Sequence, residues 1–536
     1  MIENYIKHEK YEKWERGIKM TSSQIGIIIS ILVYLCGMLL VGFVSSKDTN
    51  DVKDFYLGGR KLGPFVTAMS AEASDMSSYL LMGVPGVAYF SGIADAGWTA
   101  AGLIVGTYLN WLLTAGRLRN YTETLDAITI PDYFKKRFKD DSNIILCLGA
   151  AFILIFFVPY TASGFSACGK LFSSLFGVNY QLAMIVSAVI IIGYTTTGGF
   201  LAASKTDFIQ SIVMTAALFF VVFYGIITAG GLGAVSENLK ALPGYLNISA
   251  TYNNATGSAD SYGLFSKITT FCWGLGYFGM PHILLRFMAV RKSSELTLSR
   301  RIASVWVVFS LGVAVILGIV GRAMTQSGVL ETLIEADNPT SASKAETLIV
   351  VLANQISEHN FLFALIAGVI IAGILASTMS TADSQLIAAS SAVSENIIQE
   401  TFGIKLSERA AMLTARITLI TVAVFGVLIA WNPNSSVFSI VSFAWAGFGA
   451  VFGPAMIMSL YWKRANKFGT IAGMISGGVM VFVWKYLVRP MGGVWNLYEL
   501  APAFLVAIIM IIVVSLITAA PDKDMIKKFE KVAKMS

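Results

Sequence analysis

The sequence has 536 residues, of which 55% are hydrophobic and only 13% are charged. That charged fraction is about half of the ~25% usual in soluble domains, so a soluble chain of this length could not cover its surface with charge. The composition also excludes disordered and collagen-like proteins, and four cysteines are too few for a disulfide framework. A polytopic membrane protein is the class that remains.

Thirteen hydrophobic stretches are long enough to cross a bilayer, which takes about 20 residues. The first is longer than the apolar core of a cleaved signal peptide, and no A-x-A-like site precedes the second. We therefore expect an all-α polytopic membrane protein with about thirteen transmembrane helices. The predicted spans lie roughly at residues 24–44, 62–90, 95–116, 143–165, 180–203, 207–231, 264–290, 302–324, 361–385, 409–431, 437–462, 469–488 and 498–518.

Lysine and arginine concentrate in the segments that follow odd-numbered spans. Segments after even-numbered spans contain few, mainly Lys240, Lys344 and Arg489. Because cytoplasmic loops are enriched in these residues, the pattern predicts an outside N-terminus and a cytoplasmic C-terminus. It also accounts for the net charge of +7 without nucleic acid. The basic residues that carry the pattern are Lys47, Lys53, Arg60, Lys61, Arg117, Arg119, Lys135, Lys136, Arg137, Lys139, Lys205, Arg286, Arg291, Lys292, Arg300, Arg301 and the tail 523–534.

Two spans are interrupted in ways that a membrane helix tolerates poorly. Residues 73–78 of span two place Asp75 among hydroxyl side chains, and residues 273–281 of span seven contain three glycines and a proline. A broken helix is stable in lipid only where its freed backbone is buried in protein or lines a cavity. Kinked packing helices would explain the glycines alone. They do not explain Asp75, whose burial costs ~2.5–3.5 kcal/mol, so a binding site is favoured.

The interrupted spans head two successive groups of five, spans 2–6 and spans 7–11. Because five is odd, the second group must cross the membrane in the opposite sense. Interrupted helices at matching positions of inverted halves indicate the binding site of a secondary transporter. The predicted division is an extracytoplasmic tail (1–23), an extra first helix (24–44), a first repeat (62–231), a second repeat (264–462), two peripheral helices (469–518) and a cytoplasmic basic tail (519–536).

A third polar cluster, residues 377–385, lies in span nine, with hydroxyls spaced so that several share one helical face. Such hydroxyls can simply bond back to their own helix. Facing the freed carbonyls of span two, they would instead form an oxygen cage suited to a hard cation. With little fixed charge nearby, a monovalent ion such as sodium fits better than a divalent one.

Two motifs resemble nucleotide-binding sites but lack the required context. Gly274-x-Gly276-x-x-Gly279 lies inside a membrane segment with no preceding strand. The run from Gly164 to Lys170 approaches a phosphate-binding loop, but Leu171 replaces the required serine or threonine. We therefore expect neither an enzyme nor an ATP-driven pump.

Several long motifs in fixed order resemble the sodium–solute symporter family, in its proline-carrying branch. They are residues 58–68 with 74–77, residues 273–279 with 281–284, residues 379–381 and residues 442–449. The resemblance covers nearly the whole chain after about residue 20. It implies a leucine-transporter-type core of two inverted five-helix repeats, with one helix before the repeats and two after them.

The resemblance also implies roles for individual residues. Sodium would be coordinated by the carbonyls of Ala73, Met76 and Ser377 and the hydroxyls of Ser380 and Thr381, with Asp75 in support. Ser77 would link the ion to the substrate. The substrate contacts would be Tyr160, Trp273, Tyr277 and Pro281, and Arg60 would be a functionally important basic residue near the cytoplasmic end. Three positions depart from the proline carriers: Tyr79, Ser377 and Ser384 stand where those have tryptophan, alanine and cysteine.

The implied function is sodium-coupled uptake of L-proline by alternating access across a bacterial cell membrane, with sodium as the co-transported ion and no obligatory protein partner. A related symporter for another amino acid, a small carboxylate or a sugar is the nearest alternative. A passive channel would need a continuous hydrated path, whereas the polar residues cluster at the helix breaks. A sensor would need a separate output partner, since the tail after residue 518 is short.

Overall fold

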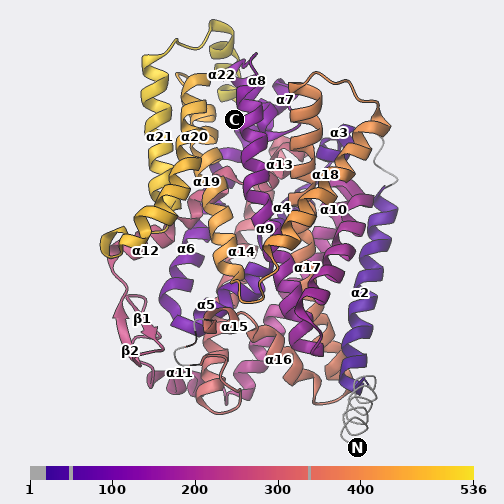
Figure 1. The fold of residues 1–536 in the computed structure, drawn as a ribbon, viewed down its shortest axis with the longest axis vertical. Helices are drawn as coiled ribbons and strands as arrows, with labels where there is room; N and C mark the ends of the chain where they lie inside the picture. Colours follow the sequence, from indigo (N-terminus) through magenta and orange to yellow (C-terminus); the bar gives the residue numbers. More distant parts are fainter. Residues whose placement is uncertain (1–19, 47–51, 336–337, 339, 536) are drawn as a thin grey trace, which may run out of the picture.

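The computed structural model describes residues 20–46, 52–335, 338 and 340–535. Residues 1–19 of the predicted extracytoplasmic tail and Lys47 of the first basic loop lie outside the described residues. The described chain is almost entirely helical, and its long helices run side by side along the longest axis of the molecule (Figure 1).

The described helices range from short segments to long helices that run along this axis. In chain order they are α2 (Ser22–Ser46), α3 (Val52–Leu57), α4 (Pro64–Asp75), α5 (Val84–Ser91), α6 (Ile93–Asn110), α7 (Gly116–Thr124), α8 (Ile130–Phe138), α9 (Ile144–Phe176), α10 (Tyr180–Thr228), α11 (Leu232–Lys240), α12 (Leu264–Phe271), α13 (Pro281–Ala289), α14 (Leu296–Gln326), α15 (Ser341–Ala345), α16 (Leu348–Ser357), α17 (Phe361–Ser391), α18 (Glu408–Ile429), α19 (Val437–Tyr461), α20 (Lys467–Val483), α21 (Leu500–Ile517) and α22 (Lys523–Met535).

Each of the thirteen predicted spans coincides with one helix, a pair of helices or half of α10. In the described part of the chain, nine helices are long and apolar enough to cross a membrane. The other four predicted spans are α4 with α5, α6 with α7, α12 with α13, and the first half of α10. Helix α10 supplies two spans because Gly199, with φ of 64°, interrupts it.

One element was not predicted. Strands β1 (Ala250–Asn253) and β2 (Ser258–Ser261) pair antiparallel, with Ala250 opposite Ser261, in the segment between α11 and α12. The hairpin lies at the end of the molecule opposite α22 (Figure 1). The fold is otherwise the all-α membrane architecture expected from the sequence.

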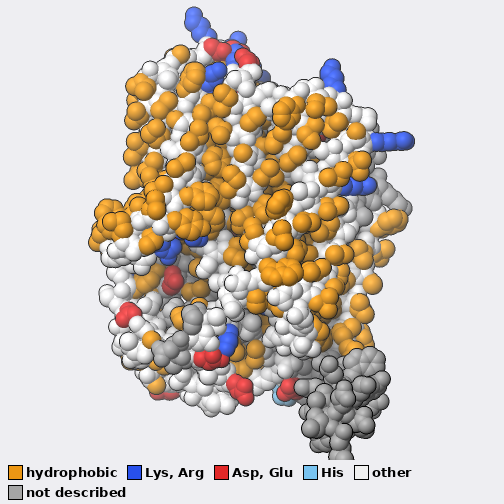
Figure 2. All heavy atoms as spheres, viewed as in Figure 1, with side chains coloured by type: hydrophobic (Ala, Val, Ile, Leu, Met, Phe, Trp, Pro, Cys, Tyr) orange, Lys and Arg blue, Asp and Glu red, His pale blue; other side chains and the backbone are white. Residues whose placement is uncertain are grey.

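The flanks of the molecule are apolar, as lipid contact requires. Figure 2 shows hydrophobic side chains spread over the sides of the helices. On α2, Val33 and Phe43 remain 69% and 67% exposed. Exposure of so many hydrophobic side chains to water would be unfavourable. We therefore assign this surface to contact with lipid.

Glycines allow one helix to touch the interrupted segment of span seven backbone to backbone. A Cβ atom on Gly106 would lie 2.3 Å from the Gly274 carbonyl oxygen, and one on Gly274 would lie 2.2 Å from the oxygen of Gly102. No side chain fits at such distances, so α6 holds the interrupted segment in place. On its other side, Gly276 leaves room for the indole of Trp445, whose Nε1 would lie 2.0 Å from a Cβ there.

Candidate functional site

The interruption predicted in span two is present between α4 and α5. Helix α4 ends at Asp75, and Met76 has ψ of 66°. The N–H of Ser77 donates to the carbonyl of Asp75 (2.8 Å), and that of Leu80 donates to Ser77 (2.9 Å). In an uninterrupted helix these two donors would satisfy the carbonyls of Ala73 and Met76. The break therefore frees both carbonyls for other partners.

Helix α17 supplies a partner for one of these carbonyls. The hydroxyl of Ser380 donates to the Ala73 carbonyl (2.8 Å) and lies 3.2 Å from the Ser377 carbonyl oxygen. The neighbouring Thr381 hydroxyl is buried and has no hydrogen-bond partner among the described residues. Ala73, Ser377 and Ser380, predicted to share an ion, thus meet at the break with Thr381 beside them.

Not every hydroxyl of the cluster faces the break. The side chains of Ser377 and Thr378 donate to the Ile374 carbonyl of their own helix, at 2.8 and 3.0 Å. This is the back-bonding alternative considered for the cluster. Ser377 can therefore offer an ion its carbonyl but not, in this arrangement, its hydroxyl.

The interruption predicted in span seven forms the second wall of the site. The chain leaves α12, forms a 3₁₀ segment at Cys272–Gly279 and continues as α13 from Pro281. Trp273 stacks on Tyr498, with ring centroids 5.0 Å apart, and on Tyr79 at 5.5 Å. The indole N–H of Trp445 donates to the Trp273 carbonyl (2.8 Å), which satisfies a backbone group of the break.

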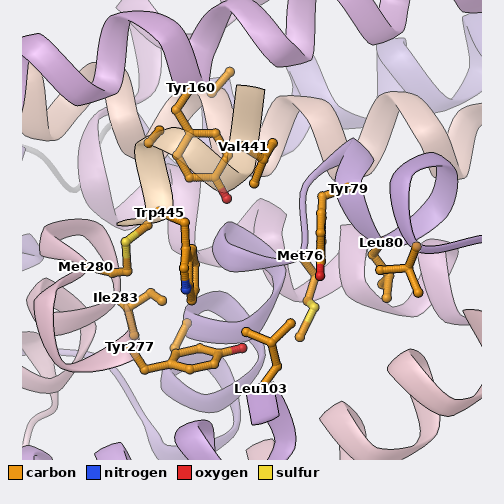
Figure 3. Packing of buried hydrophobic residues seen from close by; sticks show 14 of the residues in the cluster. Met76, Tyr79, Leu80, Leu103, Tyr160, Tyr277, Met280, Ile283, Val441 and Trp445 are labelled. Carbon is orange, nitrogen blue, oxygen red and sulfur yellow. The ribbon is translucent and has the colours of Figure 1, made fainter. Parts of the chain in front are cut away.

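Asp75 joins the two interrupted helices directly. Its carboxylate accepts a hydrogen bond of 2.5 Å from the hydroxyl of Tyr277. Its carbonyl accepts one of 3.3 Å from the hydroxyl of Tyr160 on α9. Figure 3 shows both tyrosines directed at the space beside Trp445. The residue predicted to support sodium is thus bonded to two residues predicted to contact the substrate.

These groups surround a small enclosed cavity of about 10 Å³. That volume can hold roughly one water molecule, so the cavity is too small for an amino acid in this conformation. The residues that line it are Asp75, Tyr79, Leu103, Tyr160, Trp273, Val441 and Trp445. Of the five predicted substrate contacts, Tyr160 and Trp273 line the cavity, while Tyr277, Ser77 and Pro281 do not.

A much larger vestibule of about 740 Å³ lies on the side of the β1–β2 hairpin. Asp95, Asp260 and Glu335 are among its lining residues. Phe438 also lines the vestibule, and its ring stacks on Tyr79 with centroids 5.6 Å apart. Since Tyr79 lines the inner cavity, this aromatic pair separates the vestibule from the cavity.

The other predicted residues hold the surrounding backbone. The hydroxyl of Ser77 accepts the N–H of Tyr79 (3.2 Å) where the helix resumes. Pro281 is the buried first residue of α13. Arg60 lies away from the cavity, because its guanidinium donates to the carbonyls of Met288 (2.6 Å) and Ala127 (2.9 Å). It thereby ties the C-terminal end of α13 to the loop after α7.

The sequence interpretation of Arg286 as a loop charge is wrong. Arg286 lies within α13 and is 1% exposed. It donates to Asp207 on α10 (3.1 Å) and to Ser384 on α17 (2.5 Å), and Ser70 on α4 donates to the same Asp207 carboxylate (2.6 Å). A hydropathy pattern assigns an arginine at the end of a span to the adjacent loop. It cannot detect an acidic partner that lies far away in the sequence.

Glu72 is a buried acidic residue that the sequence analysis missed. It is 1% exposed on α4 and accepts a hydrogen bond of 2.9 Å from the indole N–H of Trp111. Its position three residues before Asp75 places both carboxyl groups on one side of the helix. A carboxylate inside a predicted span was the available signal.

A sequence model described as the Sodium:solute symporter family matches residues 55–477. The chain belongs to this family. Family membership and the geometry of the two helix breaks both agree with a membrane transporter.

Its relatives include proteins of similar length that are named as proline carriers. It is 40% identical to the osmoregulated proline transporter of Bacillus subtilis over 95% of this chain and 99% of that protein. It is 40% identical to the sodium/proline symporter of Escherichia coli over 94% of this chain and 95% of the other. The sodium/proline symporter of Haemophilus influenzae is 39% identical over 95% and 97%.

Two solved structures share the fold. A substrate-bound, outward-open Na⁺-coupled sialic acid symporter matches with a TM-score of 0.74 and 18% identity, over 93% of this chain and 99% of that one. A nucleobase-cation-symport-1 family transporter in a closed conformation matches with a TM-score of 0.54 and 15% identity, over 90% and 99%. These matches confirm the predicted leucine-transporter-type core.

The Arg286–Asp207 pair gives a testable prediction. Asp207→Asn leaves a buried guanidinium without its counter-charge, so we expect the free energy of unfolding to fall by about 3–5 kcal/mol. Combining it with Arg286→Gln should recover part of that loss. Thermal unfolding in detergent measures both. The control is Glu237→Gln, which removes an exposed pair with Lys240 and should change little. A single-variant loss no larger than the control's would contradict the expectation.

Proposed function

We propose that this protein couples the inward flow of sodium to the uptake of L-proline by alternating access. The observation that carries the proposal is the direct bond between Asp75, beside the oxygen cluster of the α4 break, and Tyr277 in the second break. The proposed ion site and the aromatic cavity are thus connected by a hydrogen bond between two side chains, those of Asp75 and Tyr277. Membership of the symporter family and similarity to proteins named sodium/proline symporters support both ion and cargo.

The proposed sodium ligands are the carbonyl oxygens of Ala73, Met76 and Ser377 and the hydroxyl oxygens of Ser380 and Thr381. Neutral oxygens suit a hard monovalent cation. The Ser380 hydroxyl, which now donates to Ala73, would turn its lone pair to the ion. Thr381 needs no rearrangement of an existing bond, because its buried hydroxyl has no partner among the described residues. Asp75 supports the site through the backbone of the break.

The proposed proline pocket is the cavity beside this ion site. Proline has a carboxylate, a cationic secondary amine and an apolar ring. Aromatic faces such as those of Trp273 and Trp445 can pack against the ring and attract the cationic nitrogen. The N-terminal end of a half-helix can receive the carboxylate. Tyr160, Tyr277, Pro281 and Ser77 are proposed to complete the pocket, which must widen before an amino acid enters.

Coupling follows from the shared partners. Sodium at the α4 break would fix the position of Asp75, and through it the hydroxyls of Tyr277 and Tyr160. The pocket is then ordered before proline binds, so each ligand binds more tightly in the presence of the other. Closure at the Tyr79–Phe438 pair and opening at the opposite end would release both. Arg60, which holds the end of α13, is proposed to take part in that opening.

The available driving force is sufficient for accumulation. Proline is net neutral, so at one-to-one coupling each cycle moves one charge, worth ~2.3 kcal/mol at about 100 mV. A tenfold sodium gradient adds ~1.4 kcal/mol, and together they would support roughly 500-fold accumulation. Uptake of a nutrient or an osmolyte needs no larger ratio.

The proposed orientation has the N-terminus outside a bacterial cell membrane and the C-terminus in the cytoplasm. Figure 2 supports it, because most of the lysine and arginine side chains in view lie at the end near α22, beside a few acidic ones, whereas acidic side chains predominate at the other end. A green fluorescent protein fused after α22 should therefore fluoresce, and alkaline phosphatase fused there should be inactive. Phosphatase fused after Gly328, at the end of α14, is the control and should be active. The opposite pattern would refute the orientation.

The sodium site can be tested with two serines of the same helix. Ser380→Ala removes a proposed ligand, so the sodium concentration for half-maximal uptake should rise at least about tenfold. Ser377→Ala removes only a hydroxyl bonded to its own helix and keeps the proposed carbonyl ligand. Sodium-dependent uptake by both variants in vesicles provides the comparison. Equal effects of the two substitutions would argue against the assigned ligands.

The function itself is tested with purified protein in proteoliposomes. An inward sodium gradient should drive accumulation of radiolabelled proline, and excess unlabelled proline should block it. Asp75→Cys should abolish accumulation, because it removes the link between the two breaks. Sodium-driven uptake of another solute but not proline would keep the symporter and reject the cargo. Proline equilibration without any sodium effect would reject coupling.

A further inference from the structure

One polar group in the wall of the inner cavity is unmatched. The side chain of Tyr79 lines the cavity and is 4% exposed, yet its hydroxyl has no hydrogen-bond partner among the described residues. In Figure 3 the hydroxyl end of this ring lies beside Met76 and on the side of Leu103. Both neighbours are apolar, so the hydroxyl finds no partner there. A buried hydroxyl without a partner is destabilising.

Three other donors around the cavity are already engaged. The hydroxyls of Tyr160 and Tyr277 both donate to Asp75. The indole N–H of Trp445 donates to the carbonyl of Trp273. The hydroxyl of Tyr79 differs from these three donors, because it has no partner in the wall and can bond to a molecule in the cavity.

Tyr79 also belongs to the part of the wall that would pack against an apolar ring. Its own ring contacts those of Trp273 and Phe438, at centroid distances of 5.5 and 5.6 Å, and these two rings lie 5.3 Å from each other, so the three form one aromatic cluster. Aromatic faces of this kind pack against rings. The unmatched hydroxyl is thus placed to meet a substituent on the cargo's ring.

The charge of Asp75 limits which substituent this can be. Asp75 lines the same cavity as Tyr79. A cargo carboxylate placed at Tyr79 would be repelled by that carboxylate across a poorly hydrated space. A neutral hydroxyl meets no such repulsion and can both donate to and accept from the phenol.

We propose that Tyr79 makes ring-hydroxylated prolines a further cargo of this transporter, by hydrogen bonding to the ring hydroxyl. The proposal rests on proline uptake as the proposed function. Plain proline would leave the Tyr79 hydroxyl unmatched, whereas a hydroxyproline would satisfy it. A site with such a group discriminates in favour of the cargo that can pair with it.

The test is competition in proteoliposomes under a sodium gradient. Uptake of labelled proline is measured in the presence of unlabelled proline, trans-4-hydroxyproline, cis-4-hydroxyproline or trans-3-hydroxyproline. At least one hydroxyproline should inhibit uptake and, when labelled, accumulate with sodium. In Tyr79→Phe the ratio of its inhibition constant to that of proline should rise about tenfold, equivalent to about 1.4 kcal/mol.

The matched control is Tyr498→Phe. Tyr498 is also buried and stacked on Trp273, but its hydroxyl donates to the Ser442 carbonyl (2.8 Å) and does not line the cavity. Its removal should leave the ratio of the two constants unchanged. If Tyr79→Phe does not fold, Tyr79→Trp removes the same hydroxyl while keeping an aromatic ring.

The proposal is overturned if no hydroxyproline inhibits uptake by the unaltered protein. It is equally overturned if the ratio is unchanged in the Tyr79 variants, or rises as much in Tyr498→Phe. These results are distinct from failure of the proposed function, which would appear first as an absence of sodium-driven proline uptake by the unaltered protein.

Discussion

The whole site depends on the need to satisfy backbone groups where α4 is broken. In lipid, no water is available to bond with a freed carbonyl, so an interrupted helix requires partners from the protein. The Ser380 hydroxyl supplies one for Ala73, and Tyr160 supplies one for Asp75. An oxygen-rich environment assembled for this purpose is also an environment that a hard cation can enter. The structural requirement and the proposed ion chemistry thus use the same atoms.

The second break shows how closely the surrounding helices must pack for this arrangement. Gly102 and Gly106 bring α6 against the backbone at Gly274, and Gly276 admits the indole of Trp445. That indole satisfies the Trp273 carbonyl. The glycines therefore do more than permit a bend: they bring partners within hydrogen-bond distance of the break. A larger residue at any of these positions would push away a group that the opened backbone needs.

Much of this organisation could be predicted from local sequence. Hydropathy predicted helices at the right places along the described chain, and nine of them are long and apolar enough to cross a membrane, since a span is a contiguous property of about 20 residues. Asp75 and the glycines of 273–281 identified both breaks, because a charged residue and clustered glycines are unusual inside apolar helical spans. The pairing of Arg286 with Asp207 could not be predicted, because the two residues lie 79 positions apart and neither stretch alone identifies its partner. The β1–β2 hairpin was missed because its strands have only four residues each. The division into repeats and the roles of the site residues stay predictions.

Two buried ion pairs lie on opposite sides of the cavity and connect different parts of the chain. Toward the hairpin end, Lys170 on α9 binds Glu346 (2.8 Å), which also accepts the N–H of Phe438 (3.0 Å). Toward the α22 end, Arg286 on α13 binds Asp207 on α10. Each pair thus joins a helix of the first predicted repeat to a residue of the second.

Separating such a pair in a dry interior is strongly unfavourable, about 3–5 kcal/mol when one charge is left uncompensated. In water the same separation costs only about 0–1 kcal/mol. Each pair therefore stabilises the contact between the two predicted repeats on its own side of the cavity for as long as its surroundings stay dry.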